Sequence, residues 1–88
     1  MEKELLDLGF NKNEIKVYLA LLKLGVSSVS EISKTSNVDR TLIYGILDKL
    51  IEKGLIKFSN FKNSDNKASY AYFLTPKGIE EKGKLTFF

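Results

Sequence analysis

The sequence contains no cysteine and no histidine. The first absence excludes disulfides, thiolate nucleophiles and thiol redox sensors, and the second removes the commonest metal ligand and general base. The sequence also has no glycine-rich phosphate loop, and its carboxylates are spread over helix surfaces rather than clustered. We therefore expect a protein that is not an enzyme, and we expect no cofactor, no metal site and no small-molecule ligand.

Long hydrophobic runs are absent as well. No stretch of about 18 apolar residues occurs. The N-terminal segment MEKELLDL is charged from its start, which does not fit a secretion signal. These two features predict a cytoplasmic protein with no membrane partner.

The chain has 88 residues, which suffice for one compact domain. A domain of this size is only marginally stable alone. Apolar side chains also gather at both ends of the chain: Leu5, Leu6, Leu8, Leu85, Phe87 and Phe88. We therefore expect a homodimer that forms through the N-terminal and C-terminal helices.

Charge is distributed unevenly along the chain. The net charge is +3, and the segment from Lys34 to Lys67 holds seven basic residues against four acidic ones. Elsewhere the two signs balance, with seven of each. A localised positive field suits a nucleic-acid partner, whereas the plain alternative is a solvated surface that is rich in lysine.

The positive segment overlaps the signals of two short helices with a tight turn between them. Ser28 begins a capping box, and Asn37 tolerates the left-handed conformation that ends a helix. Asp39 can cap a second helix, which we expect over residues 40–53 with Gly54 as its stop. A short helix, a tight turn and a longer helix form a helix-turn-helix.

The second of these helices has two unlike faces. Its apolar positions recur at helical spacing and predict a buried side: Ile43, Ile46, Leu47, Leu50 and Ile51. Its opposite side is polar: Arg40, Thr41, Tyr44, Asp48 and Lys49. A polar front on the longer helix is what a helix-turn-helix presents to its partner.

Two helices are expected before this unit. The first covers residues 2–8, and the second starts at a capping-box-like pair of Asn11 and Glu14 and ends at Gly25. The second carries an apolar stripe that should pack under the helix-turn-helix. We expect Tyr18 to be a core residue, because a ligand-stacking role is less common for a tyrosine at this spacing, and we expect Leu47 and Leu50 to pack on Leu19 and Leu22.

After Gly54 the pattern changes to alternation. Residues 55–61 and 68–74 predict two strands around the polar turn KNSDNK, which makes a β-hairpin. Lys62 and Lys67 flank its tip, either as nucleic-acid contacts or as a plain solvated turn. Thr75 and the following proline then open a last helix over about 76–85.

The order of these elements matches a winged helix-turn-helix domain, mostly α with a small β-hairpin (α+β). It would span residues 1–88, with the helix-turn-helix over about 28–54 and the wing over about 55–74. The chain resembles MarR/TrmB-like transcription regulators in three motifs: NEIKVYLALLKLG, VDRTLIYGILDKLIEKGLI and YFLTPKGIEEKGKLTFF. The long C-terminal helices of MarR dimers and the sensor domain of TrmB-type proteins are not among these residues.

The resemblance implies a set of DNA contacts. Candidates for reading bases in the major groove are Asp39, Arg40, Thr41 and Tyr44, and candidates for approaching phosphate from the preceding helix are Ser28 and Ser30. At the tip of the wing, where MarR regulators often have Asp-x-Arg, this chain has Asp65, Asn66 and Lys67. Lysine still pairs with phosphate but lacks the planar fork of arginine.

The leading hypothesis is a sequence-specific regulator that binds double-stranded DNA, with helix 40–53 in the major groove and the wing on the backbone or minor groove. Further phosphate candidates are Lys49, Lys57, Lys62 and Lys67. The alternative is a protein-interaction module of a transcription complex, which an exposed Leu42 on the front face would favour. Arg40 is the only arginine, and it can pair with a guanine edge, with a phosphate or with a nearby carboxylate.

Overall fold

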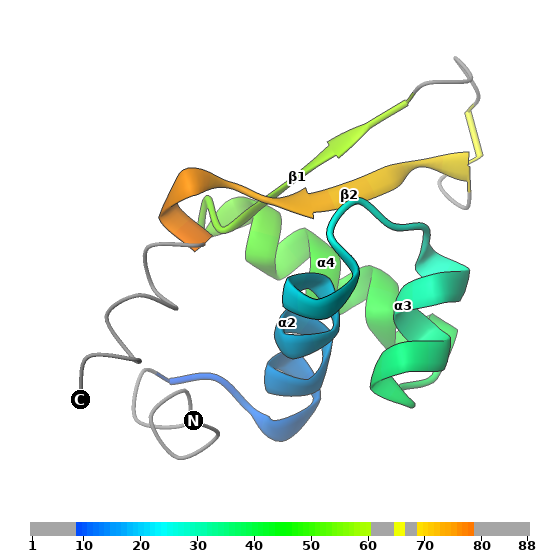
Figure 1. Cartoon of the computed structure of the whole chain (residues 1–88). Helices are drawn as coiled ribbons and strands as arrows, with labels where there is room; N and C mark the ends of the chain where they lie inside the picture. Colours follow the sequence, from blue (N-terminus) through cyan, green and yellow to red (C-terminus); the bar gives the residue numbers. More distant parts are fainter. Residues whose placement is uncertain (1–8, 61–64, 67–68, 79–88) are drawn as a thin grey trace.

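The computed structural model describes residues 9–60, 65–66 and 69–78. Its elements are α2 (Lys12–Leu24), α3 (Val29–Ser36), α4 (Arg40–Glu52), β1 (Ile56–Ser59) and β2 (Ala71–Leu74). The three helices pack together, and the hairpin of β1 and β2 projects away from them (Figure 1). The helix expected over residues 2–8 and the last helix beyond residue 78 lie outside the described residues. The predicted winged helix-turn-helix architecture is confirmed.

Both capping boxes form as predicted. At the start of α2 the Asn11 backbone N–H donates to Glu14 Oε1 at 2.9 Å, and the Glu14 N–H donates to Asn11 Oδ1 at 2.8 Å. At the start of α3 the Ser28 N–H donates to Glu31 Oε1 at 3.1 Å. These pairs satisfy backbone N–H groups that have no partner inside the helix. The sequence alone therefore sets where both helices begin.

The helix ends also match their sequence signals. Asn37 has φ 58° and ψ 32°, the left-handed conformation that closes α3. Asp39 caps α4 by accepting from the Thr41 N–H, and Gly54 after it has φ 76°. The turn between α3 and α4 is held further by the Ser33 hydroxyl, which donates to the Val38 carbonyl at 2.8 Å. The two helices of the motif therefore have a fixed mutual orientation.

The core lies between the three helices and the base of the hairpin. Its buried apolar residues are Phe10, Ile15, Val17, Tyr18, Ala20, Leu21, Val29, Ile32, Val38, Ile43, Leu47, Leu50, Leu55, Ile56 and Tyr72. Tyr18 is a core residue as predicted, with 1% of its surface exposed, and its hydroxyl donates to the Gly78 carbonyl at 2.6 Å.

The buried side of α2 matches the prediction only in part. Leu19 and Leu22 are only partly buried, whereas Val17 and Leu21, four positions apart on one face, are fully buried. The apolar stripe of α2 is broader than one face needs, so its periodicity did not decide which part would meet α4. The contacts with neighbouring elements selected the Val17–Leu21 side.

The hairpin is antiparallel, and it pairs Ile56 with Leu74 and Phe58 with Tyr72. Both strands are shorter than predicted. Before β2 the chain is still turning, because the Ser69 N–H donates to the Asn66 carbonyl. A further pairing was not anticipated. Ser27 and Tyr72 exchange two backbone hydrogen bonds, of 3.0 and 2.8 Å. This bridge ties the hairpin to the residue just before the cap of α3.

The segment after β2 closes the end of α4. Lys77 Nζ donates to the Lys53 carbonyl at 3.1 Å, and Thr75 Oγ1 donates to the Gly54 carbonyl at 2.7 Å. The Thr75 N–H donates to the Leu55 carbonyl at 2.9 Å. Three consecutive carbonyl groups, from the C-cap of α4 to the residue before β1, thus find partners in residues that follow the wing.

Gly78 completes this junction. A Cβ at this position would lie 2.3 Å from the Leu55 carbonyl oxygen, a distance that real Cβ atoms essentially never show. The backbones of the two segments therefore approach so closely that only glycine fits without displacement. The hydrogen bond from Tyr18 to the Gly78 carbonyl fixes the same point from α2.

Candidate nucleic-acid interface

The first turn of α4 lies against the first turn of α3. The Arg40 guanidinium donates a hydrogen bond to the Ser30 hydroxyl, and both residues are exposed. The link joins the two helices at the surface and holds the only arginine of the chain at the N-terminal end of α4. The positive end of the helix dipole and a guanidinium therefore share one site.

The exposed front of α4 continues from this end. Thr41, Gly45 and Asp48 are exposed and follow one another at helical spacing, so they share one face. Tyr44 is partly buried at the edge of this face. The charge changes sign along it, from Arg40 at the start to Asp48 and Glu52 near the end. An anionic partner would meet the N-terminal half of α4 more favourably than the C-terminal half.

An aromatic surface on the wing lies close to the front of α4. Burial raises the pKa of Tyr72 to about 12, with smaller contributions from Tyr44, Asp48 and Tyr70. Tyr44 and Asp48 belong to α4, so the Tyr72 hydroxyl is within electrostatic reach of that helix. Further out along the hairpin, Phe58 stacks on Tyr70 with ring centroids 5.1 Å apart, and 48% of Phe58 is exposed.

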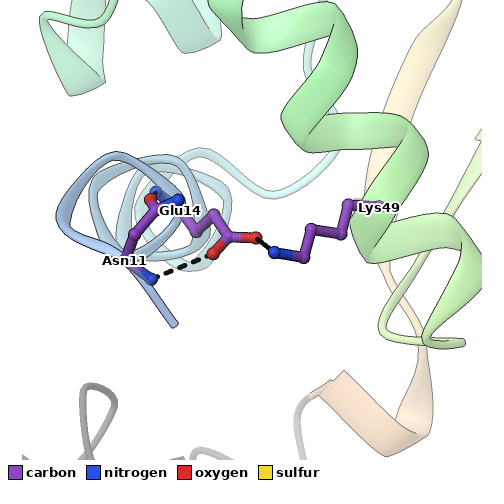
Figure 2. A network of polar contacts seen from close by, with 3 residues as sticks. All are labelled: Asn11, Glu14 and Lys49. Atoms are coloured by element: carbon purple, nitrogen blue, oxygen red, sulfur yellow. Dashed lines mark hydrogen bonds and ion pairs between the residues drawn. The ribbon is translucent and has the colours of Figure 1, made fainter. Parts of the chain in front are cut away.

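A buried ion pair attaches α4 to α2 (Figure 2). Glu14 is 1% exposed, and its Oε2 lies 3.0 Å from Lys49 Nζ, whose side chain is half exposed. The other carboxylate oxygen of Glu14 accepts the Asn11 N–H of the capping box. One side chain therefore caps its own helix and binds the neighbouring one.

The charge state of Glu14 follows from these partners. Burial acts to raise the pKa of the Glu14 carboxyl, but the Asn11 backbone N–H and the ammonium groups of Lys49 and Lys53 together hold it below its ordinary value. Glu14 is thus ionised at neutral pH, and the pair with Lys49 is a true ion pair. The sequence suggested only a capping role for this residue.

Two expected phosphate contacts have partners within the chain. Lys49 pairs with Glu14, and the hydroxyl of Ser28 accepts the Glu31 N–H and contacts the Glu31 carboxylate. Lys53, part of the positive segment, has its ammonium 4.8 Å from the centre of the Phe10 ring. Because Glu14 lies outside this segment and pairs with Lys49, the positive field of the segment is weaker than its residue count indicates.

Three of the other candidates are exposed to solvent. Ser30, Arg40 and Lys57 are exposed, whereas Lys62 and Lys67 lie outside the described residues. Lys34 was not selected from the sequence, yet it is exposed one helical turn after Ser30 on α3. Its spacing from Ser30 is the signal that would have found it.

Two other features are absent from the described part of the chain. Among the described residues, no helix is long and apolar enough to cross a membrane, and no group of three His, Cys, Asp or Glu side chains is placed to hold a metal ion. An open depression of about 240 Å³ lies between α2 and α3, lined by Lys16, Leu19, Ala20, Lys23, Thr35 and Ser36.

Solved structures share this fold. MarR from E. coli in its apo form superposes with a TM-score of 0.76 at 22% identity, covering 94% of this chain and 60% of that one. A MarR-family transcriptional regulator from Silicibacter pomeroyi gives a TM-score of 0.77 at 21% identity, covering 97% of this chain and 56% of that one. At these identities the likeness concerns the fold alone.

Sequence relatives are more specific. The chain is 38% identical over 60 residues to the HTH-type sugar sensing transcriptional regulator TrmBL1 of Pyrococcus furiosus, covering 64% of this chain and 18% of that protein. It is 30% identical over 77 residues to an uncharacterized protein of Methanocaldococcus jannaschii, covering 88% of this chain and 57% of that protein. The chain thus spans only 18% and 57% of the lengths of these two relatives.

A family match covers most of the chain. Residues 5–76 match the family described as sugar-specific transcriptional regulator TrmB. The matched stretch contains α2, α3, α4 and both strands of the hairpin, and it ends one residue after Thr75. The chain therefore belongs to the TrmB family of transcriptional regulators.

Proposed function

We propose that this chain is a cytoplasmic transcriptional regulator that binds double-stranded DNA in a sequence-specific manner. The N-terminal half of α4 enters the major groove, and the hairpin acts as the wing on the backbone or minor groove. The observation that carries the proposal is the exposed end of α4, where Arg40 is held on Ser30 beside a polar front. Membership of a family of transcriptional regulators supports it.

Within this proposal the residues divide into two roles. Arg40, Thr41 and Tyr44 read bases, with Asp39 beside them at the cap of α4. Phosphate contacts come from the exposed surface of α3 and from the wing: Ser30, Lys34, Lys57, Lys62 and Lys67. We leave Lys49 out of this group, because binding a phosphate would take it away from the buried Glu14. The hydroxyl of Ser28 is engaged in its capping box.

The proposal includes a homodimer that reads two half-sites. The contact would be formed by the N-terminal and C-terminal helices, which places two α4 helices about 34 Å apart along one DNA turn. Light scattering at high micromolar concentration should give twice the mass of the chain, and deletion of residues 85–88 should shift the protein toward the monomer. A monomer at that concentration would contradict this part of the proposal.

A protein partner is the second candidate, and one observation favours it. Leu42 is 52% exposed on α4. It lies seven positions before Lys49, which points toward α2, so it occupies the edge of α4 rather than the Thr41–Asp48 face. This edge is separate from the proposed DNA-binding face.

A selection of random duplex DNA, followed by gel shifts at two salt concentrations, tests the function. An enriched sequence motif that binds more tightly than a scrambled duplex is expected, and affinity for both should fall as salt rises. Equal binding to all duplexes, or none, would contradict a sequence-specific regulator.

The variant Arg40→Ala should separate base reading from phosphate binding. The loss of a guanine contact should cost about 1–3 kcal/mol per half-site and flatten the preference at one base pair. The matched control Lys57→Ala should weaken cognate and scrambled duplexes alike and make the salt slope shallower by about one unit. Fluorescence anisotropy on both duplexes across a salt series measures the two effects. If Arg40→Ala weakens both duplexes equally, Arg40 binds phosphate and the specificity comes from Thr41, Tyr44 or DNA shape.

A further inference from the structure

Gly45 lies in the second turn of α4, inside a helix that otherwise has no glycine. Glycine in a helix interior destabilises the helix by about 1 kcal/mol relative to alanine, because folding fixes a backbone that is more mobile in the unfolded chain. The position is exposed, and it lies on the same face as Thr41 and Asp48. A residue that weakens the central helix of the fold calls for a physical reason.

The other glycines in the described part of the chain each have such a reason. Gly9, Gly25 and Gly54 have φ between 74° and 92°, which L side chains rarely adopt. At Gly78 a Cβ would lie 2.3 Å from a backbone oxygen. Gly45 has neither feature, since its φ is not positive and a Cβ built on it meets no described atom within 4 Å. Nothing in the folded chain therefore requires a glycine at position 45.

We infer that Gly45 is the point at which the DNA comes closest to the backbone of α4. This inference rests on the proposed function and deepens it. On the front of α4, Thr41 lies one turn before Gly45 and Asp48 lies about one turn after it. Because Gly45 has no side chain, it leaves a shallow notch in the helix surface between these two residues. An edge of the DNA groove can enter that notch, and a side chain at position 45 would push it away.

Close approach at Gly45 also determines how α4 lies in the groove. A helix that touches DNA only with its first turn would bring Arg40 close and leave position 45 in solvent. Close approach at Gly45 instead lays the helix along the groove, so that Thr41, Tyr44 and Asp48 all face base edges. Asp48 can then accept a hydrogen bond from a cytosine amino group, which offsets part of the repulsion between its charge and the phosphates.

The variant Gly45→Ala tests this inference because stability and affinity should change in opposite directions. The methyl group meets open space, so the thermal midpoint should rise by about 4–8 °C in a domain of this size. Affinity for the selected duplex should fall about tenfold, and Gly45→Leu should lose more. A side chain with only a structural role would not lower affinity while it raises the thermal midpoint.

Two comparisons keep the test decisive. Asn13→Ala changes an exposed position of α2 away from the proposed interface, and it should leave affinity unchanged. If Gly45→Ala binds as tightly as the parent chain while Arg40→Ala binds more weakly, the inference fails and the proposed function stands. If the parent chain binds no selected duplex, the proposed function itself fails.

Discussion

Replacing Lys49 by methionine is expected to destabilise the fold by about 3 kcal/mol, at the lower end of what breaking a buried pair costs, because Lys49 is itself half exposed. Methionine keeps most of the length and apolar contact of the lysine stem but leaves the buried Oε2 of Glu14 without its paired ammonium. The cost arises from that uncompensated carboxylate. Urea denaturation at pH 7 measures the loss, and Lys16→Met, at an exposed position of α2, is the matched control with little expected effect.

The same variant should reverse the pH dependence of stability. In the parent chain the pKa of Glu14 is lowered on folding, so its contribution is present above the ordinary value of 4.5 and is lost as the pH falls through the folded pKa. Without Lys49, burial is opposed only by the Asn11 N–H and the Lys53 ammonium, and we expect it to raise the pKa of Glu14 above its ordinary value. The folded state then takes up a proton more readily than the unfolded state, and the variant should gain stability as the pH falls from 7 toward 4.5.

A further substitution assigns this reversal to Glu14. Glu14→Gln combined with Lys49→Met should remove the pH effect, because glutamine carries no titratable group. The amide can still accept the Asn11 N–H and so preserves the start of α2. If Lys49→Met shows the same pH dependence as the parent chain, the Glu14–Lys49 pair does not couple α2 to α4.

Leu47→Ala is expected to cost about 2–5 kcal/mol of the free energy of unfolding, from lost burial and the cavity that remains. Leu47 is 1% exposed on the inner side of α4, where it belongs to the same core cluster as Val17 and Leu21 of α2. A domain of this size has only about 5–15 kcal/mol in total, so the loss is a large share of it. Thermal and urea denaturation measure it.

The matched control lies on the same helix. Leu42→Ala removes an identical side chain that is 52% exposed, and its effect should stay within about 0.5 kcal/mol. Both substitutions change helix propensity equally, so their difference isolates burial. Equal effects of the two variants would mean that α4 is turned differently from the described structure.

Local structure was predictable from the sequence. The sequence predicts caps at Asn11, Ser28 and Asp39 and helix ends at Asn37 and Gly54. All of these are observed. Each depends on a side chain and a backbone group no more than three residues apart, or on the φ of a single residue. Hydrogen bonds of this range do not depend on how the helices pack. The polar front of α4 followed in the same way, from helical periodicity.

The remaining features depended on contacts between distant parts of the chain. The sequence did not indicate that Lys49 would bind Glu14, that Ser27 would pair with Tyr72, or that residues 75–78 would close the end of α4. It also left open which side of α2 would be buried. Each outcome required two segments to be placed side by side, and residue type alone does not determine that placement.

The same distinction between local features and contacts of distant segments applies to the candidate interface. Residue types and spacing were enough to select Arg40, Thr41 and Tyr44 as candidates, because a helix start and a helical repeat are local properties. Only the tertiary structure determined which lysines have partners within the chain, since that depends on whether a neighbouring element offers a carboxylate or a ring. It likewise separated Gly45 from the other described glycines, because open space around a residue is a property of the whole fold.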